Sequence, residues 1–200
     1  MLVAHKFYDF TAPAIFSNGE IVQDFNLSKY MKNKASVLFF WPMNFTFVCP
    51  SELIAFDKRY NEFQKRNVNI IGISIDTVYS HKTWRSIDIK KGGIGPVKYP
   101  MVSDIKKDII RLYNVEHPSL GIALRASFLI DKNGIIRHQI VNDLPLGRDI
   151  DEIIRVIDAL NFHETHGHVC PAQWKKNKPG MVPSNSGSNI TIYNCFNYLI

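Results

Sequence analysis

Residues 37–41 (VLFFW) form an unbroken apolar run. This run restricts the fold more than any other feature, because it indicates a buried strand. A helix is predicted soon after it from apolar residues at three- and four-residue spacings, Leu53, Phe56, Tyr60 and Phe63. Cys49 lies between the two patterns, where the helix is expected to begin. The unpaired N–H groups and the dipole of a helix N-terminus stabilise an anion, so this position suits a nucleophilic thiolate.

The rest of the chain alternates between strand and helix patterns after an irregular entry over residues 1–34. Strands are predicted over residues 36–41, 68–75, 125–131 and 135–142, and helices over residues 50–66, 78–90 and 149–162. Asp104 is expected to cap a short helix that ends near Tyr113, and residues 132–134 (KNG) supply a hairpin turn. This order predicts an α/β fold with a central mixed β-sheet flanked by helices.

The composition permits a globular domain and indicates no charged partner. Apolar residues make up 46% of the chain, which is enough for a core of ordinary size. The net charge is +6, yet the basic residues are scattered, which favours a solvated surface over a nucleic-acid site. The start of the chain carries charges and no long apolar run, so neither a signal peptide nor a membrane span is expected. We therefore expect a cytoplasmic protein, in which a disulfide is transient and catalytic.

The three cysteines differ in their setting. Cys170 lies 121 positions after Cys49 (170 − 49), and one activated thiol with one distant partner suggests redox chemistry. Thr46 precedes Cys49 by one helical turn and could present a hydroxyl to its sulfur. Arg125 is the best candidate for a nearby cation, although a surface arginine in an ion pair fits the sequence equally well. Cys195 fits a small buried residue or an accidentally exposed one.

The segment after the last predicted helix differs from the expected domain, residues 1–162. It is rich in Pro, Gly, Ser and Asn, which predicts a C-terminal arm over residues 163–200, either mobile or docked on another surface. Possible zinc ligands are concentrated there, in His163, His166, His168 and Cys170. Structural zinc sites usually draw paired ligands from two separated groups, and this chain has no C-x-x-C, so no metal is expected.

Five separated segments resemble, in order, the motifs of one family. They are residues 45–52 (FTFVCPSE), 92–95 (GGIG), 123–131 (ALRASFLID), 142–148 (NDLPLGR) and 169–172 (VCPA). On these motifs the chain resembles the typical two-cysteine peroxiredoxins of the bacterial alkyl hydroperoxide reductase type, over roughly residues 1–183. Two departures are visible. Asn44 stands where the family usually has an aspartate, and the tail from about Ser184 carries Tyr193 at a shifted spacing.

The resemblance implies a thioredoxin-like fold and a role for each matching residue. Cys49 would be the peroxidatic thiolate, which reduces hydrogen peroxide and organic hydroperoxides and becomes a sulfenic acid. Pro42 would shield this intermediate, while Thr46 and Arg125 would hold the thiolate and polarise the O–O bond. Two further residues are implied to orient the arginine, Glu52 and Arg148.

The resemblance also implies the rest of the cycle. Cys170 would be the resolving thiol that forms an inter-subunit disulfide with Cys49, and thioredoxin or a dedicated flavoprotein reductase would then reduce it. A homodimer is the implied minimum unit and a decameric ring of dimers is expected, with no metal, haem or flavin cofactor. Two other classes stay open: a holdase chaperone or signalling partner, and a thioredoxin-like dithiol oxidoreductase, which the missing C-x-x-C disfavours.

Overall fold

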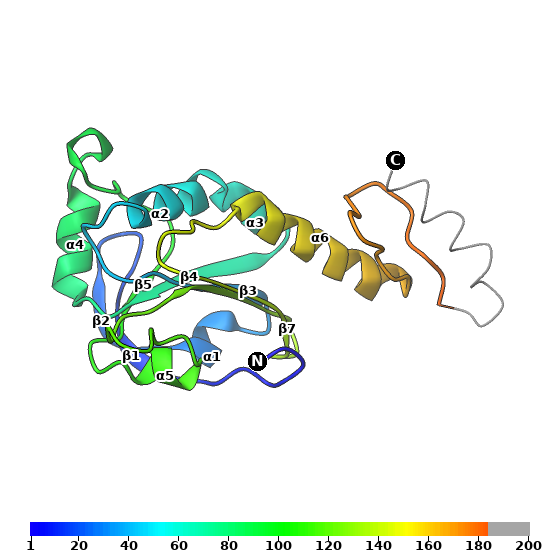
Figure 1. Ribbon diagram of the computed structural model, residues 1–200, viewed down its shortest axis with the longest axis horizontal. Helices are drawn as coiled ribbons and strands as arrows, with labels where there is room; N and C mark the ends of the chain where they lie inside the picture. The colour runs from blue at the N-terminus through cyan, green and yellow to red at the C-terminus, as the bar shows by residue number, and fades with distance from the viewer. Residues whose placement is uncertain (184–200) are drawn as a thin grey trace. The chain divides into compact units, whose positions relative to one another are not determined.

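The computed structural model describes residues 1–183, which form a mixed β-sheet with flanking helices (Figure 1). The strands are β1 (Thr11–Ile15), β2 (Ile21–Asn26), β3 (Ala35–Phe40), β4 (Val68–Ser74), β5 (Met101–Ser103), β6 (Arg125–Ile130) and β7 (Ile136–Asn142). They are arranged in the order β2-β1-β5-β4-β3-β6-β7. The helices are α1 (Leu27–Met31), α2 (Cys49–Lys58), α3 (Tyr60–Lys65), α4 (Val78–Ser86), the 3₁₀ turn η1 (Ile89–Lys91), α5 (Asp108–Leu112) and α6 (Ile150–His166). The predicted α/β class and mixed central sheet are confirmed.

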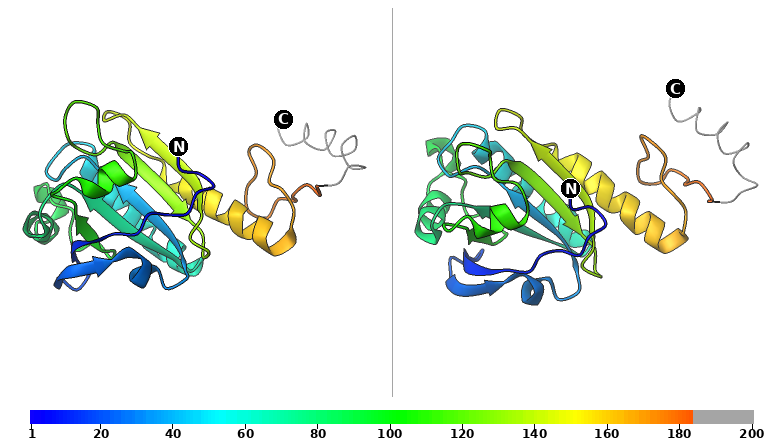
Figure 2. Two further views of the ribbon diagram at one scale, coloured as in Figure 1. Left: turned by 90° about the horizontal axis from the view of Figure 1, so that it is seen from below. Right: turned by 60° about the horizontal axis from the view of Figure 1, so that its bottom comes forward.

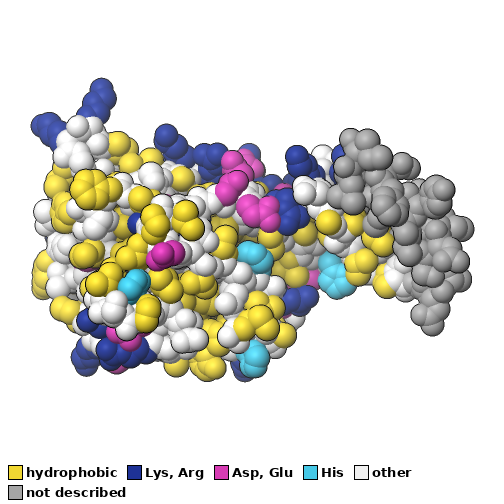
Figure 3. Space-filling view, in the orientation of Figure 1, with side chains coloured by type: hydrophobic (Ala, Val, Ile, Leu, Met, Phe, Trp, Pro, Cys, Tyr) yellow, Lys and Arg dark blue, Asp and Glu magenta, His cyan; other side chains and the backbone are white. Residues whose placement is uncertain are grey.

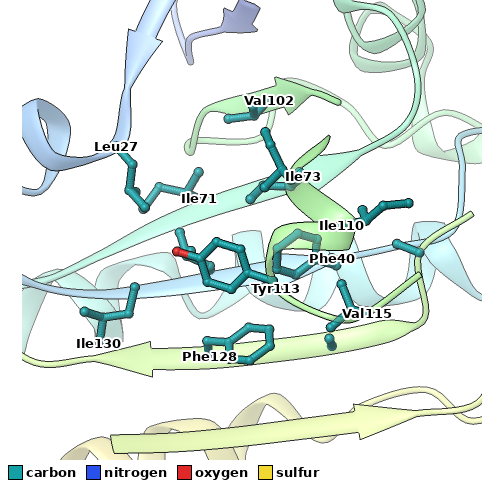
Figure 4. Close-up of a cluster of buried hydrophobic side chains, with 14 of the residues drawn as sticks. Leu27, Phe40, Ile71, Ile73, Val102, Ile110, Tyr113, Val115, Phe128 and Ile130 are labelled. Atoms are coloured by element: carbon teal, nitrogen blue, oxygen red, sulfur yellow. The ribbon is translucent and has the colours of Figure 1, made fainter. Parts of the chain in front are cut away.

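Strand β3 lies inside the sheet, where it pairs in parallel with β4 and antiparallel with β6. Its side chains alternate between the two faces. Leu38 and Phe40 belong to the core cluster on one face, together with residues of α1 and α5 (Figure 4). Phe39 stacks on Phe56 of α2 on the other face, with ring centroids 4.0 Å apart. Both faces of β3 are buried, as its unbroken apolar sequence predicts.

Gly72 of β4 permits the aromatic packing beneath α2. A Cβ atom at this position would lie 2.8 Å from Phe39 Cζ and 2.9 Å from Trp41 Cζ3, closer than van der Waals contact. Phe39 also meets the ring of Tyr99 edge-on, with 5.3 Å between ring centroids. This close approach of backbone and rings explains why a glycine interrupts an otherwise β-branched strand.

The N-terminal segment runs beside the β6–β7 hairpin before it reaches β1 (Figure 2). The backbone N–H groups of Ala4 and Phe7 donate to the carbonyls of Ile136 and Gly134, both at 2.8 Å. Strands β1 and β2 then pair antiparallel across a turn in which Gly19 has a φ of 86°. The irregular entry expected over residues 1–34 therefore consists of short extended pieces followed by α1.

Three predicted helices have different bounds in the structure. The helix expected over residues 50–66 begins at Cys49 and divides into α2 and α3 at Arg59, whose backbone leaves helical geometry with φ −91° and ψ 1°. The helix expected over residues 78–90 ends as α4 at Ser86, because Ile87 is extended with ψ 134°. The helix expected over residues 149–162 continues as α6 to His166.

Asp104 is not an N-cap by position, because α5 begins at Asp108 and follows Lys107, whose φ is 62°. The Asp104 carboxylate nevertheless accepts the backbone N–H groups of Ile109 and Ile110 at 3.1 and 2.8 Å. The predicted position was wrong, but the carboxylate satisfies free N–H groups of the first turn as a capping residue does. Strand β5 is not predicted from the sequence, because its three residues are too few to establish a period.

The chain divides into two compact units, Met1–Ile150 and Asp151–Ile200. The boundary expected after residue 162 stays a prediction. The unusual tail over residues 184–200, with Tyr193 and Cys195, lies outside the described residues. None of the helices over residues 1–183 is long and apolar enough to cross a membrane.

The segment that follows α6 folds back on this helix in the second unit. Trp174 is buried, and its ring centroid lies 5.0 Å from that of Phe162. Arg155 donates to the Trp174 carbonyl at 3.0 Å. Val169 and Met181 form an antiparallel bridge. This part of the predicted arm is therefore docked on its own helix.

Candidate active site

Cys49 lies at the junction that the sequence predicts, as the first residue of α2. Residues 41–48 connect it to β3, and a proline, Pro50, occupies the first turn of the helix, where a missing N–H is least harmful. The Cys49 side chain is completely buried. The positive end of the helix dipole therefore acts on a thiol that water does not screen.

Arg125, the first residue of β6, contacts this thiol directly. Its Nη1 lies 3.3 Å from Cys49 Sγ, and the guanidinium is buried. Its Nε donates to the carbonyl of Leu144 at 2.6 Å, which fixes the direction of the side chain. The surface ion pair that fitted the sequence equally well is excluded by this burial. A guanidinium in contact with a buried sulfur favours the thiolate.

Glu52 links two arginines beneath the thiol. Its Oε2 accepts Nη1 of Arg125 at 2.8 Å. Its Oε1 accepts both the backbone N–H and the Nε of Arg148, at 3.0 and 2.8 Å. The carboxylate is almost fully buried, so its three hydrogen bonds form where water cannot compete with them. The predicted orienting roles of Glu52 and Arg148 thus have a geometric basis.

Arg148 is held from several directions. Its Nη1 donates to the Ala126 carbonyl and, at 3.2 Å, to Ser127 Oγ. Its guanidinium carbon lies 5.5 Å from the ring centroid of Phe39 and 5.9 Å from that of Phe56, which places the cation against aromatic faces. Burial lowers the pKa of Arg148, and the contact with Glu52 opposes this effect.

The four side chains Cys49, Glu52, Arg125 and Arg148 form what we call the ionic cluster. Two guanidinium groups and one carboxylate leave one surplus positive charge when all three are ionised. Buried charges are stable only when they are paired. Cys49 Sγ is in direct contact with Arg125, so an anion at this sulfur would be paired with the surplus positive charge.

Pro42 and Thr46 lie in the segment between β3 and Cys49. Pro42 is buried, as the shielding role requires, and Thr46 is half-buried. The Thr46 hydroxyl donates to the Met43 carbonyl at 3.1 Å, rather than to Cys49. The structure therefore brings Arg125, Glu52 and Arg148 together around the sulfur, while the predicted contact of Thr46 stays a prediction. The donated hydrogen bond leaves the lone pairs of Thr46 Oγ1 available as acceptors.

Large apolar side chains near Cys49 are exposed. Phe47, two residues before it, is 100% exposed, and Phe45 is 54% exposed. Leu146, in the loop that supplies the Leu144 carbonyl to Arg125, is 58% exposed. Exposed apolar side chains gathered around a reactive group indicate a surface that another molecule covers.

A second group of buried polar residues around the same segment is not predicted from the sequence. From the sequence, Asn44 stands out only as a departure from the family pattern, and His81 is not indicated as a site residue. The sequence of α4 holds a pattern that could have revealed these residues. Val78, His81 and Arg85 recur at helical spacing, so His81 and Arg85 lie on the same buried face as a valine. Arg85 donates to the Ser17 and Val97 carbonyls at 3.0 and 2.9 Å.

Cys170 belongs to the second unit. Its thiol is half-buried and donates to the Ala159 carbonyl of α6 at 3.5 Å. Burial raises the pKa of Cys170, and the positive charge of Arg155 opposes this rise. Both Cys49 and Cys170 are free thiols, and their pairing stays a prediction.

The histidines next to Cys170 bind backbone carbonyls. His163 Nδ1 lies 2.8 Å from the His168 carbonyl, and His166 Nδ1 lies 3.0 Å from the Phe162 carbonyl. Over residues 1–183, no three His, Cys, Asp or Glu side chains come together as possible ligands of a metal ion. These contacts explain the histidines as part of the folded end of α6.

Comparison with known proteins gives consistent matches over both units. Residues 3–139 match the model of the AhpC/TSA family, and residues 159–189 match the C-terminal domain of 1-Cys peroxiredoxin. The chain is 59% identical over 186 residues to alkyl hydroperoxide reductase C of Buchnera aphidicola subsp. Schizaphis graminum, covering 93% of this chain and 94% of the relative. It is 47% identical to the mitochondrial thioredoxin-dependent peroxide reductase of Drosophila melanogaster, covering 84% and 71%. The crystal structure of reduced 2-Cys peroxiredoxin from Plasmodium vivax has a TM-score of 0.90 at 42% identity, covering 96% and 99%.

Proposed function

Because this chain belongs to the AhpC/TSA family and is a thiol-dependent peroxidase, we propose that Cys49 is the thiol that attacks the peroxide. One observation carries the assignment: Cys49 Sγ lies 3.3 Å from Arg125 Nη1 at a buried helix N-terminus. The surplus positive charge of the ionic cluster favours the nucleophilic form of sulfur there. Cys170 binds a carbonyl instead and has its pKa raised by burial, so it suits a thiol that reacts second.

The first step transfers one oxygen atom. The Cys49 thiolate attacks the terminal oxygen of a hydroperoxide, an S–O bond forms and the O–O bond breaks. Cys49 becomes a sulfenic acid, while the leaving oxygen takes up a proton and departs as water or an alcohol. Arg125 can donate to the reacting oxygens while it holds the sulfur, and the free lone pairs of Thr46 Oγ1 can accept the proton of the bound peroxide. Buried Pro42 limits the access of water.

Cys170 completes the proposed cycle as the resolving thiol. It attacks the sulfenic acid of Cys49 in a second subunit, a disulfide forms and water leaves. Its hydrogen bond to the Ala159 carbonyl must break first. Cysteine Cα atoms must come within about 4.4–6.8 Å to be bridged, so the segment that holds Cys170 must leave α6 at least locally.

A disulfide reductase then restores both thiols by exchange. We propose thioredoxin or a dedicated flavoprotein reductase as this partner, and hydrogen peroxide and organic hydroperoxides as substrates. The exposed Phe45, Phe47 and Leu146 support a surface covered by a second copy, and we propose a homodimer that assembles into a decameric ring. We keep the cytoplasm as the proposed compartment, because a disulfide that is reduced in every cycle needs a reducing environment.

The charges on the face drawn in Figure 3 do not indicate a further class of partner. On the face in Figure 3, Lys and Arg side chains lie at several separate places and form no single block. Nucleic-acid binding proteins gather such charges along one face. We therefore propose neither a nucleic acid nor a membrane among the partners.

The assignment is tested with Cys49→Ser and Cys170→Ser in the full chain. Cys49→Ser should lose peroxide consumption by roughly a thousandfold or more, because Cys49 supplies the attacking sulfur of the proposed first step. Cys170→Ser should still be oxidised once by peroxide, with a sulfenic acid trapped by dimedone and identified by mass spectrometry. On a non-reducing denaturing gel, the oxidised wild type should run as a dimer and Cys170→Ser as a monomer. Turnover by Cys49→Ser would reject the assignment, and a monomeric oxidised wild type would reject the inter-subunit bond.

A further inference from the structure

Asn44 connects the segment before Cys49 to Trp41, the residue that follows β3, and to α4. Its Oδ1 accepts Nε1–H of Trp41 at 3.1 Å. Its Nδ2 lies 2.9 Å from Ser80 Oγ and 3.0 Å from His81 Nδ1. Its backbone N–H donates to Asp76 Oδ2 at 2.9 Å. The side chain is 5% exposed, so water does not replace any of these partners. We call the side chains of Trp41, Asn44, Ser80 and His81 the Asn44 network.

The orientation of the Asn44 amide follows from its neighbours. An indole N–H can only donate, so the atom that faces Trp41 Nε1 must be the acceptor Oδ1. The NH₂ group then faces Ser80 and His81 and donates one hydrogen to each. The opposite orientation would place two donors against each other at Trp41.

This orientation determines the protonation of His81. Its Nδ1 accepts from Asn44 and therefore carries no proton. Its Nε2 lies 3.2 Å from the Val102 carbonyl, which can only accept, so Nε2 carries the proton. The ring is completely buried. A neutral imidazole with its proton on Nε2 satisfies both neighbours, whereas an imidazolium would place two donors, Nδ1–H and the amide, against each other.

Charged groups nearby also disfavour an imidazolium. Arg85, one turn further along α4, is a buried cation whose field opposes a second positive charge. The segment after β4 contributes Asp76, but its carboxylate accepts from the Asn44 backbone and from Ser74 Oγ at 2.7 Å. The residue after β3 contributes the neutral Trp41 ring, and β5 contributes the Val102 carbonyl. Burial and the field of Arg85 lower the pKa of His81 to about 4, in agreement with this geometry.

The residue that follows Asn44 has a strained backbone. Phe45 has a φ of 57°, in the left-handed region that a bulky side chain adopts only at a cost in conformational energy. Such a conformation persists when its surroundings over-determine it. The four hydrogen bonds of Asn44 provide this constraint one residue before Phe45 and five residues before Cys49 (49 − 44).

We propose that Asn44 is a positioning residue for Cys49, and that its amide keeps the segment of residues 42–48 ordered independently of pH by holding His81 neutral. This inference goes beyond the peroxidase activity and rests on the role proposed for Cys49. A carboxylate of the same shape would change the result. It cannot donate to Nδ1, so it would favour a doubly protonated His81 and make the order of the segment depend on the proton.

The first measurement is made on the wild-type sequence, and a variant serves only to assign its signal. The side-chain nitrogens of ¹⁵N-histidine-labelled, reduced full-length protein are followed by NMR from about pH 5 to about pH 8, the range in which an ordinary histidine titrates. The signal of His81 is assigned with His81→Asn. It should keep the pattern of a neutral ring protonated on Nε2 throughout. Titration of His81 inside this range would overturn the proposal, whether or not Cys49 proves to be the peroxidatic thiol.

The second measurement compares Asn44→Asp with Ser80→Ala as a matched control. Ser80→Ala removes one hydrogen bond of the network and introduces no charge. The rate of Cys49 oxidation by hydrogen peroxide is measured by stopped flow, as a ratio to wild type, between about pH 6 and about pH 8. For Asn44→Asp the ratio should fall about fivefold as pH rises, because deprotonation of His81 removes one buried hydrogen bond. For Ser80→Ala the ratio should be flat. A flat ratio for both variants would overturn the proposal, and if Asn44→Asp does not fold, the NMR titration of wild type decides.

Discussion

The ionic cluster and the Asn44 network adjoin the same segment of chain, but the first is held together by buried charges and the second by hydrogen bonds between neutral groups. The ionic cluster collects two guanidinium groups around Glu52 and leaves one positive charge for the Cys49 sulfur. The Asn44 network is built from neutral groups whose donors and acceptors match one to one. Charge is concentrated at the Cys49 sulfur, where the proposed reaction forms a bond. The neutral network holds the segment of residues 42–48, which leads to Cys49. Variants that remove or add one charge test this division.

The largest expected effect is on stability, in Glu52→Gln. Removing this carboxylate takes away the counter-charge that binds both buried guanidinium groups, and breaking a buried ion pair in this way costs about 3–5 kcal/mol. The free energy of unfolding of the reduced protein is measured by guanidinium chloride denaturation. Glu62→Gln is the matched control, since Glu62 also binds two cations, Lys65 and Arg66, but at an exposed site. Equal loss in both variants would show that burial does not set the strength of the ionic cluster.

The Asn44 network predicts an acid-dependent stability. His81 has a pKa lowered to about 4 in the folded chain against 6.5 when unfolded. Below pH 6.5 the unfolded chain therefore binds the proton and the folded chain does not, so stability falls as pH decreases from 6.5 to about 4. The loss amounts to as much as about 3 kcal/mol at 1.36 kcal/mol per pKa unit.

This slope is measured by denaturation at a series of pH values. His81→Asn keeps a hydrogen-bonding side chain but cannot titrate, so it should be less stable at neutral pH and lose less stability on acidification. If the free energy of unfolding changes with pH in the same way in wild type and in His81→Asn, a group other than His81 causes the acid dependence.

The next largest effect is on the rate, in Arg125→Met. This change keeps the length of the side chain and removes the cation 3.3 Å from Cys49 Sγ. Removing one donor from a transition state typically costs about 100-fold in rate, and we expect a loss of that order in Cys49 oxidation by peroxide. Alkylation of Cys49 by iodoacetamide at a fixed pH should slow as well.

Arg85→Met is the control for this prediction. Arg85 is also buried, but it donates to backbone carbonyls, those of Ile15, Ser17 and Val97. It should lose stability while the folded fraction reacts with peroxide at nearly the rate of wild type. A similar loss of rate in both variants would mean that Arg125 acts through the fold rather than through the sulfur.

The smallest expected effect is at Cys170. An arginine, Arg155, also acts on this cysteine, but the site is more exposed than that of Arg125 and Cys49. Arg155 opposes the rise in the pKa of Cys170 that burial causes. Arg155→Met should therefore raise this pKa further and lower the thiolate fraction at neutral pH, by no more than about threefold because solvent screens the pair. The pH dependence of Cys170 alkylation in a Cys49→Ser background measures the change. Arg155→Lys keeps the charge and should behave like wild type, and an effect as large as that at Arg125 would contradict the role of burial.

Local patterns were enough to predict the elements around Cys49 and the position of Cys49 between them. The run 37–41 and the helical spacing after Cys49 are properties of adjacent residues, and both are confirmed. The hairpin of β6 and β7 was likewise predicted from its turn residues. The division of the long helix at Arg59 was not predicted, because the apolar spacing continues across it without interruption.

The sequence by itself determined where the thiol lies relative to a strand and a helix, because that relation is contained within a few residues. Only the tertiary structure decided whether Arg125 is a surface residue or the cation of the site, since Cys49 and Arg125 are 76 positions apart and meet through the pairing of β3 with β6. The same holds for Asn44 and His81, whose contact depends on how α4 is placed beside the end of β3. Hydrogen bonds between distant side chains depend on position in space, and no local pattern of apolar and polar residues records that position.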